Sequence, residues 1–331
     1  MRSKILLIVV ILLVFLACHI AKQRLARIDP PVDSTGGTTN ETTGQSSIQT
    51  PRQEQPRRIV SMAPSITEIL FALKLGDRVV GVSNYCNYPA EAKKIDRIGG
   101  VMDPNLEAVV ALKPDLVVML HGNKALCPSL ERLGIKTLLV DHKTIRGVLE
   151  SIPTIGQSCG NTSAARKMTD DLRARIEQVR QKTSGLRRPK VMVSVIRRLG
   201  TGRLEDVYVA GNDRYFDEMI EIAGGQNVFA DQPVRYPVVS NESIIKANPE
   251  IIIDIVSSVS DISSADDKKS GKSYINEMRA KTLADWQQLS DVDAVASGKV
   301  YYLDENYISV PGPRFILVLE KLQKLLHPEA D

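Results

Sequence analysis

The sequence has little net charge and lacks a complete phosphate-binding or dinucleotide-binding motif. Its 43 Lys and Arg residues nearly balance 39 Asp and Glu residues, which leaves a net charge of +4. No basic surface for nucleic acid is therefore expected. Gly271 to Ser273 fails as a P-loop because Asp266 stands where that motif needs glycine, and Gly200 with Gly202 does not make a dinucleotide-binding fingerprint. We predict neither nucleic-acid binding nor catalytic residues.

Histidine is also scarce, with four in the chain. Only His121 and His142 follow predicted strands, where a residue of a binding cleft could lie. Neither has cysteine or carboxylate neighbours at the spacing of a metal site, so no metal and no resident cofactor are predicted. A surface or cleft-rim position explains both histidines. The alternative for His121 is axial ligation of a metal inside a bound molecule.

The N-terminus carries an export signal. Arg2 and Lys4 precede an apolar run from Ile5 to Ala17, which is too short to span a bilayer and is typical of a signal peptide. The run ends at Cys18, as in a bacterial lipobox, although Phe15 replaces the preferred leucine. We predict a lipoprotein signal peptide over residues 1–18 with lipidation at Cys18. An ordinary signal peptide or an uncleaved anchor would also place the chain outside the cytoplasm.

Residues 19–56 are predicted to form a flexible linker. Ser34 to Thr50 consists largely of Ser, Thr, Gly, Asn and Gln and has one apolar side chain, Ile48. Such a segment cannot bury enough surface to offset its ordering entropy. The linker would tether the remaining domain to a membrane, either in the periplasm or on the outer face of the cell membrane.

Three further cysteines follow the linker, namely Cys86, Cys127 and Cys159. In an oxidising compartment, three thiols favour one disulfide and one unpaired cysteine. The sequence does not indicate which two would pair.

The remaining chain contains an internal repeat. Pro114 and Pro249 each separate a short helical pattern from an apolar β-branched run, and they are 135 residues apart. A second pair, Lys136 to Asp141 and Lys299 to Asp304, follows at an offset of 163 residues, so a polar insertion is expected near 257–282. The positions matched at the first offset are Glu107 with Glu242, Val109 with Ile244, Val110 with Ile245, Asp115 with Glu250, and Leu116 to Val118 with Ile251 to Ile253.

This repeat predicts an α/β fold of two similar lobes. Each lobe would be a parallel sheet flanked by helices, because α and β patterns alternate. We place the N-terminal lobe at 57–160 and the C-terminal lobe at 188–331. The connecting segment, 161–187, has apolar residues at spacings of three and four and reads as one long amphipathic helix. Chance likeness between βα units is the alternative to a true repeat.

One local signal concerns the start of the first helix. Ser65 and Glu68 have the spacing of a capping box. The two side chains are therefore expected to cap that helix.

Aromatic side chains gather after the predicted strands, where ligands of open α/β sheets bind. Tyr85 and Tyr88 follow one strand, Tyr236 precedes the second helix-Pro-strand unit, and Tyr307 and Arg314 follow the last strand. Each tyrosine alone could be a packing or surface residue. As a group they favour a cleft for a large, partly apolar ligand.

Glu107 and Glu242 occupy equivalent first-turn positions of the repeat. The helix dipole favours a carboxylate there, which could explain one of them. Their equivalence favours docking onto a two-fold symmetric partner with basic pockets.

Several stretches resemble the vitamin B12-binding proteins of ABC importers, within the class III periplasmic binding proteins that also bind ferric siderophores and haem. The resemblance covers Arg57 to the C-terminus. It rests on Val80 to Pro89, Ile98 to Gly100, Asn105 to Asp115, Ala223 to Phe229 and Pro311 to Arg314.

The resemblance implies two lobes bridged by one helix, with the ligand between them, and arginines of two permease subunits facing Glu107 and Glu242. Tyr85 and Tyr236 fall at ligand-contact positions of the family. Val101 and Leu120 stand where the best-known B12 binder has tryptophans, so the exact ligand stays open. The full set of predicted ligand contacts is Tyr85, Tyr88, Met102, His121, Tyr236, Tyr307 and Arg314.

The sequence thus predicts a monomeric, lipid-anchored receptor that binds a cobalt corrinoid. It would deliver the corrinoid to a two-fold ABC permease with ATPase subunits. The alternative ligand is haem or a ferric siderophore. Two competing classes are an enzyme on a related two-lobed scaffold and a lipoprotein scaffold without a small ligand.

Overall fold

The computed structural model describes residues 55–199, 201–255 and 280–330. The predicted signal peptide, Cys18, nearly all of the linker and most of the predicted insertion lie outside these residues. Contacts divide the chain into Met1–Arg52 and Gln53–Asp331, and the fold below is that of the second unit. None of the helices in the described part of the chain is long and apolar enough to cross a membrane.

The first lobe is built on a five-stranded sheet in the order β3-β2-β1-β4-β5, with every neighbouring pair parallel. Apart from the edge strand β3, its strands carry β-branched and other apolar residues, and β4 is almost wholly buried, as expected when helices cover both faces. The strands are β1 (Ile59–Ser61), β2 (Val79–Val82), β3 (Asp96–Arg97), β4 (Leu116–Leu120) and β5 (Lys136–Val140).

Helices pack on both faces of this sheet. Alternate residues of β1 and β4 enter two cores, one shared with α2 and α5 and the other with α3 and α4. The helices are α2 (Pro64–Ala72), α3 (Leu106–Ala111), α4 (Cys127–Arg132) and α5 (Ile145–Ser158), with the 3-10 turns η1 (Gly76–Arg78), η2 (Ala90–Lys94) and η3 (His121–Leu126).

The second lobe has a mixed sheet, which differs from the fully parallel one expected. Its main path is β11-β10-β6-β7-β9, and β8 also pairs with β6. The pairs β6–β10, β10–β11 and β6–β8 are parallel, whereas β6–β7 and β7–β9 are antiparallel. The strands are β6 (Lys190–Ile196), β7 (Val207–Val209), β8 (Gln226–Asn227), β9 (Val238–Val239), β10 (Ile251–Ile255) and β11 (Val300–Leu303).

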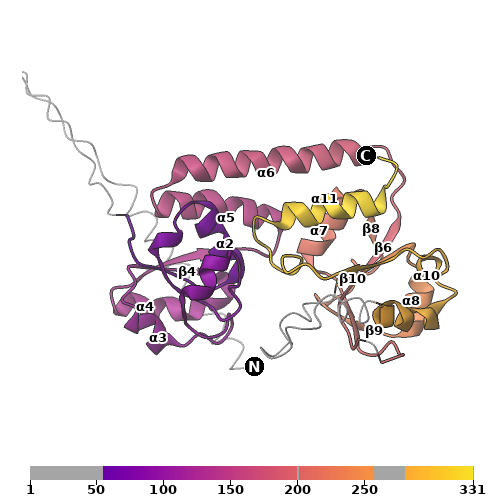
Figure 1. Cartoon of the computed structure of the whole chain (residues 1–331), viewed down its shortest axis with the longest axis horizontal. Coiled ribbons are helices and arrows are strands. Elements are labelled where there is room, and N and C mark those ends of the chain that lie inside the picture. The colour runs from indigo at the N-terminus through magenta and orange to yellow at the C-terminus, as the bar shows by residue number, and fades with distance from the viewer. Residues whose placement is uncertain (1–54, 200, 256–279, 331) are drawn as a thin grey trace, which may run out of the picture. The chain divides into compact units, whose positions relative to one another are not determined.

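A single long helix connects the two lobes. The helix α6 (Thr162–Thr183) packs against α5 of the first lobe and against α7 and α11 of the second (Figure 1). One apolar core on this side contains residues of both sheets. The second-lobe helices are α7 (Arg214–Ile222), α8 (Asn241–Ala247), α10 (Asp293–Ala296) and α11 (Phe315–Leu326), with the 3-10 turn η5 (Trp286–Leu289).

The repeat extends to backbone detail. Lys113 and Asn248, which precede the two prolines, both have left-handed φ angles, of 46° and 42°. Asp115 accepts hydrogen bonds from the amides of Arg57 and Arg58, and the equivalent Glu250 accepts one from the amide of Lys190. Each carboxylate thus ties the start of one strand to the start of its neighbour.

The expected disulfide is wrong for the described cysteines, because Cys86, Cys127 and Cys159 are all free thiols. Cys86 is buried in the first lobe, with Sγ 3.1 Å from both Thr67 Oγ1 and Ser83 Oγ. Cys159 is buried at the end of α5, where burial raises the pKa of its thiol to about 11. The buried thiols therefore have separate surroundings and act as small packing groups.

Candidate functional site

Four of the predicted ligand residues lie at the carboxyl ends of the first-lobe strands. Tyr85 and Tyr88 follow β2, Met102 follows β3, and His121 directly follows β4. Tyr85 is 64% exposed and Met102 is 77% exposed, so most of each apolar side chain can be covered by a ligand. His121 is also exposed.

Met102 and His121 belong to two loops that touch. The Nδ2 of Asn123 donates to the carbonyl oxygen of Val101 over 2.8 Å. A Cβ at Gly122 would lie 3.9 Å from the Met102 methyl carbon. The Met102 side chain therefore lies near the backbone of the turn that carries His121, and thioether and imidazole groups are both able to ligate a haem iron.

On the second lobe, Tyr236 is held by a buried carboxylate. Its hydroxyl donates to Asp213 Oδ2 over 3.1 Å, and Arg235 Nε donates to Asp213 Oδ1 over 2.6 Å. The Arg235 guanidinium lies 5.0 Å from the centre of the Tyr236 ring. Burial and the charge of Asp213 raise the pKa of Tyr236, so the phenol stays protonated and its ring is fixed in place.

A row of exposed apolar side chains lies close to Tyr236 in the second sheet. This row was not predicted from the sequence. Ile196, Tyr208 and Val238 are register partners across β6, β7 and β9, and their exposed fractions are 60%, 37% and 55%. The row spans two strand spacings, or about 10 Å. Their positions in the chain form no pattern, because only strand pairing brings them together, so no sequence signal could have found the row.

Tyr88, Tyr307 and Arg314 are brought together from the two lobes. The Arg314 guanidinium lies 3.7 Å from the centre of the Tyr88 ring and 5.1 Å from that of Tyr307. Arg314 also pairs with Glu68 of α2, with Nε–Oε2 at 3.0 Å and Nη2–Oε1 at 2.5 Å. Its Nη1 donates to Asn306, so all three nitrogens already have protein partners.

Glu68 was expected to cap a helix, and that expectation is wrong. The helix α2 begins at Pro64, and no side chain caps it. Ser65 instead contacts His142, with 2.7 Å between its Oγ and Nδ1, and Ser151 Oγ lies 2.9 Å from Nε2. Burial lowers the pKa of His142 to about 4, so this histidine is a neutral core residue rather than part of a cleft.

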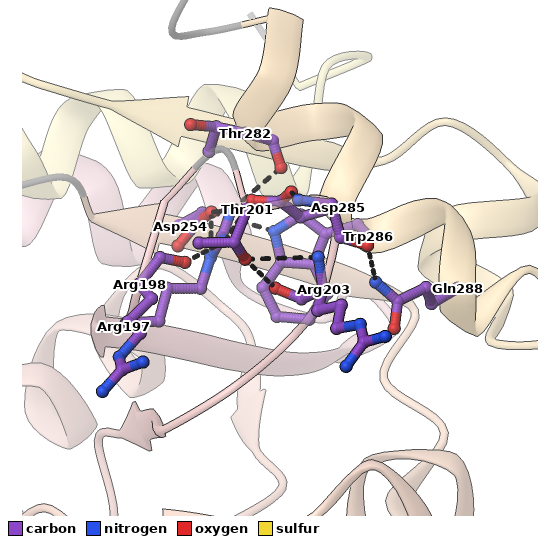
Figure 2. Close-up of polar contacts among 10 residues, drawn as sticks. Arg197, Arg198, Thr201, Arg203, Asp254, Thr282, Asp285, Trp286 and Gln288 are labelled. Carbon is purple, nitrogen blue, oxygen red and sulfur yellow. Dashed lines mark hydrogen bonds and ion pairs between the residues drawn. The ribbon is translucent and has the colours of Figure 1, made fainter.

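A buried charged cluster lies at the carboxyl ends of β6 and β10 (Figure 2). Arg197 pairs with Asp254 and Asp285, each at 2.8 Å, and no more than 1% of any of these side chains is exposed. Trp286 Nε1 donates to Asp254 Oδ2 over 2.9 Å. The Thr282 carbonyl accepts from Arg197 Nη2. The cluster fixes residues 282–286 to the end of β6.

Glu107 and Glu242 are both exposed, in the first turns of α3 and α8. Each helix begins with a side-chain cap at the equivalent position, since Asn105 accepts from the Ala108 amide and Ser240 from the Ser243 amide. The two carboxylates therefore stand in matching local frames, one on each lobe.

A groove of about 980 Å³ lies elsewhere, between α5, α6 and α7. None of the predicted ligand residues lines it. Its walls mix both charges, including Arg173, Arg180, Glu177 and Glu221. Within residues 55–199, 201–255 and 280–330, no cluster of three His, Cys, Asp or Glu side chains is placed to hold a metal ion.

The chain is similar in sequence and in fold to periplasmic binding proteins. A family model described as "Periplasmic binding protein" matches residues 59–307. YvrC of Bacillus subtilis, an uncharacterized ABC transporter substrate-binding lipoprotein, is 29% identical over 282 residues, covering 84% of this chain and 82% of that one.

Two solved structures are also similar. The periplasmic vitamin B12 binding protein BtuF of Vibrio cholerae has a TM-score of 0.66 at 25% identity, covering 82% of this chain and 96% of its own. The periplasmic heme-binding protein RhuT of Roseiflexus sp. RS-1 has the same TM-score at 24% identity, covering 83% and 99%. At this identity, the similarity to RhuT concerns the fold and not the ligand.

Proposed function

The chain belongs to the periplasmic binding protein family, and from this premise we propose that it captures cobalamin or a related corrinoid and delivers it to an ABC importer. Members of this family bind solutes without transforming them, so the chain is a binding protein and not an enzyme. The protein would act outside the cytoplasm as a monomer, tethered by lipid at Cys18.

The observation that carries the ligand proposal is the set of exposed rings at the carboxyl ends of both sheets. Tyr85 and Tyr88 stand on the first lobe, and Tyr236 and the apolar row Ile196–Tyr208–Val238 on the second. Flat apolar surfaces with hydrogen-bonding rims suit a wide macrocycle with polar edges. Corrinoids have this character, and the likeness to the vitamin B12 binding protein of Vibrio cholerae adds support.

A haem or ferric siderophore is the second candidate ligand. It is favoured by the exposed His121 and Met102 on neighbouring loops, since both types of side chain can ligate haem iron. His121→Ala separates the two ligands. In a haem receptor it would change the visible absorption spectrum of the bound iron, whereas in a corrinoid receptor it would change affinity at most.

The test of the ligand is calorimetric titration of the purified protein with cyanocobalamin, haemin and a ferric siderophore. Saturable binding of cyanocobalamin at micromolar levels is expected. Tyr208→Ser should weaken that binding, while Leu133→Ser, a change of a 60% exposed residue on the first lobe, serves as the control. Absence of corrinoid binding would refute the proposal.

Glu107 and Glu242 are proposed to meet arginines of the two permease subunits. Replacing both with alanine should leave ligand affinity unchanged and reduce uptake in cells, because exposed charge pairs mainly guide docking. Glu150→Ala with Glu177→Ala removes two other exposed carboxylates and should leave uptake intact. A fall in ligand affinity instead would assign Glu107 and Glu242 to the binding surface.

A further inference from the structure

Glu68 and Arg314 form a contact between the two lobes that the proposed function does not use. Glu68 lies in α2 of the first lobe, and Arg314 precedes α11 of the second, 246 residues later. The pair is bidentate, and the side chains are 4% and 15% exposed. Bidentate arginine–carboxylate pairs fix orientation as well as distance.

The backbone around this pair is built for close approach. A Cβ at Gly312 would lie 2.9 Å from Glu68 Oε2 and 3.3 Å from Ser65 Cα, so only glycine fits there without a shift. The Tyr215 hydroxyl of α7 donates to the carbonyl oxygen of Val310 over 3.3 Å. The second-lobe segment before α11 is therefore pressed onto α2 of the first lobe and tied at its other side to its own lobe.

Two tyrosines proposed to contact ligand touch the same guanidinium. Tyr88 belongs to the first lobe and Tyr307 to the second, and Arg314 lies near both ring centres. Cations near aromatic faces are attracted to the ring quadrupole. Because Glu68 and Asn306 take all three nitrogens of Arg314, the arginine is better placed to orient these rings than to bind ligand.

We propose that Glu68 and Arg314 form an interlobe clasp that holds Tyr88 and Tyr307 in fixed relation on the ligand-binding surface. Glu68 is then a positioning residue, and Arg314 acts through the tyrosines. The part of this inference that concerns ligand rests on the proposed function. The clasp between the lobes does not depend on it.

Burial explains why the clasp would be sensitive to loss of either partner. Burial raises the pKa of Glu68, and the charge and hydrogen bonds of Arg314 oppose that rise. Removing the arginine leaves a desolvated carboxylate, and removing the carboxylate leaves a desolvated cation. In either case, separation of the lobes becomes more favourable in free energy, because it lets water reach the group that has lost its partner.

The test compares Glu68→Gln with Glu320→Gln. Glu320 makes a similar bidentate pair with Arg175, at 2.8 Å for both bonds, between α11 and α6 and with both side chains about a third exposed. It is a matched control away from the tyrosines. Arg314→Lys is the second clasp variant, since it keeps the charge and loses the bidentate geometry.

Lobe separation is measured without ligand, by spin labels at Leu133→Cys and Ile245→Cys. These two sites are exposed, one on each lobe, and Cys127→Ser removes the partly exposed native thiol. Glu68→Gln and Arg314→Lys should broaden the distance distribution, and Glu320→Gln should not. A narrow distribution in both clasp variants would overturn the clasp.

Ligand binding is measured on the same proteins without labels, with cyanocobalamin and haemin as probes. Affinity for the probe that the wild type binds should fall by roughly 5- to 150-fold in the clasp variants, mainly through faster dissociation, because two rings must be ordered on binding. Broadened distances with unchanged affinity would overturn the positioning role. If the wild type binds neither probe, the proposed corrinoid and haem functions fail together with the positioning role, while the distances still decide the clasp.

Discussion

Replacing Arg197 with methionine should destabilise the protein strongly. Arg197 is the cation of a cluster in which Asp254 and Asp285 are as buried as the arginine itself (Figure 2). Methionine keeps much of the side-chain volume but leaves two carboxylates without their shared cation. It also removes the guanidinium that lies 5.3 Å from the centre of the Trp286 ring.

The size of the effect follows from burial. Breaking a buried ion pair by removing one partner costs about 3–5 kcal/mol, because the remaining charge is desolvated and unpaired. Typical domains have about 5–15 kcal/mol of total stability, so this single change would remove a large share. The expected fall in melting temperature is on the order of 10 °C.

Trp286 is the only tryptophan in the chain and reports on this cluster directly. Its fluorescence can follow urea unfolding of the wild type and of Arg197→Met, with circular dichroism as a second probe. Arg198→Met is the control, since its side chain is 66% exposed and pairs only at the surface with Glu205 and Asp206. That change should have little effect.

A triple variant separates charge from packing. Adding Asp254→Asn and Asp285→Asn to Arg197→Met removes the charges of all three side chains in these two ion pairs, and much of the lost stability should return. If Arg197→Met lowers the unfolding free energy by less than about 1 kcal/mol, the reasoning from burial is refuted. If the triple variant has a lower free energy of unfolding than Arg197→Met, packing and hydrogen bonds contribute more to the stability of the cluster than its charges do.

Three further predictions concern other parts of the fold. The pKa of His142 is lowered from 6.5 to about 4, so stability should be complete above pH 6.5 and fall by about 3 kcal/mol as the pH drops to 4. Denaturant titrations of His142→Gln should lack this share of the acid loss, and an unchanged pH profile would contradict it. Gly312→Ala should lower the melting temperature, because its Cβ would meet Glu68 Oε2 at 2.9 Å; a stabilised variant would mean that the segment moves away at no cost. Ser240→Ala removes the cap of α8 and should destabilise by about 1 kcal/mol in urea unfolding, with Ser240→Asp restoring most of it.

Much of the fold could be predicted from the internal repeat. The offset of 135 residues correctly matched α3 with α8 and β4 with β10, because both units must end a helix before a proline and start a buried strand. The long α6 was also readable, since its apolar spacing is regular and no Gly or Pro interrupts it. These features depend on local chemistry.

The antiparallel part of the second sheet was not readable. The strands β7 and β9 have three and two residues, which is too short for a periodic signal. Their direction is set by hydrogen bonds such as that from the Gly211 amide to the Arg235 carbonyl, which join positions far apart in the sequence. The apolar row Ile196–Tyr208–Val238 was hidden for the same reason.

Single residues of the candidate site could be predicted from the sequence, but the contacts between the two lobes could not. Tyr85, Tyr88 and His121 could be placed after strands by pattern alone, and their ligand roles remain predictions. Glu68 could not, because the local spacing of a capping box competes with a partner 246 residues away. A local motif records what is possible nearby, and burial against another lobe can redirect the same side chain.

The two lobes repeat each other's fold, yet the order of synthesis makes them unequal. When the first lobe leaves the ribosome, Glu68 has no arginine to meet, and the first amide of α5, at Ile145, lacks the Glu218 carboxylate that accepts its hydrogen bond over 2.8 Å. Both partners arrive only with the second lobe. We therefore expect a chain cut after residue 160 to be incomplete, so that the halves of this duplicated protein are no longer separable modules.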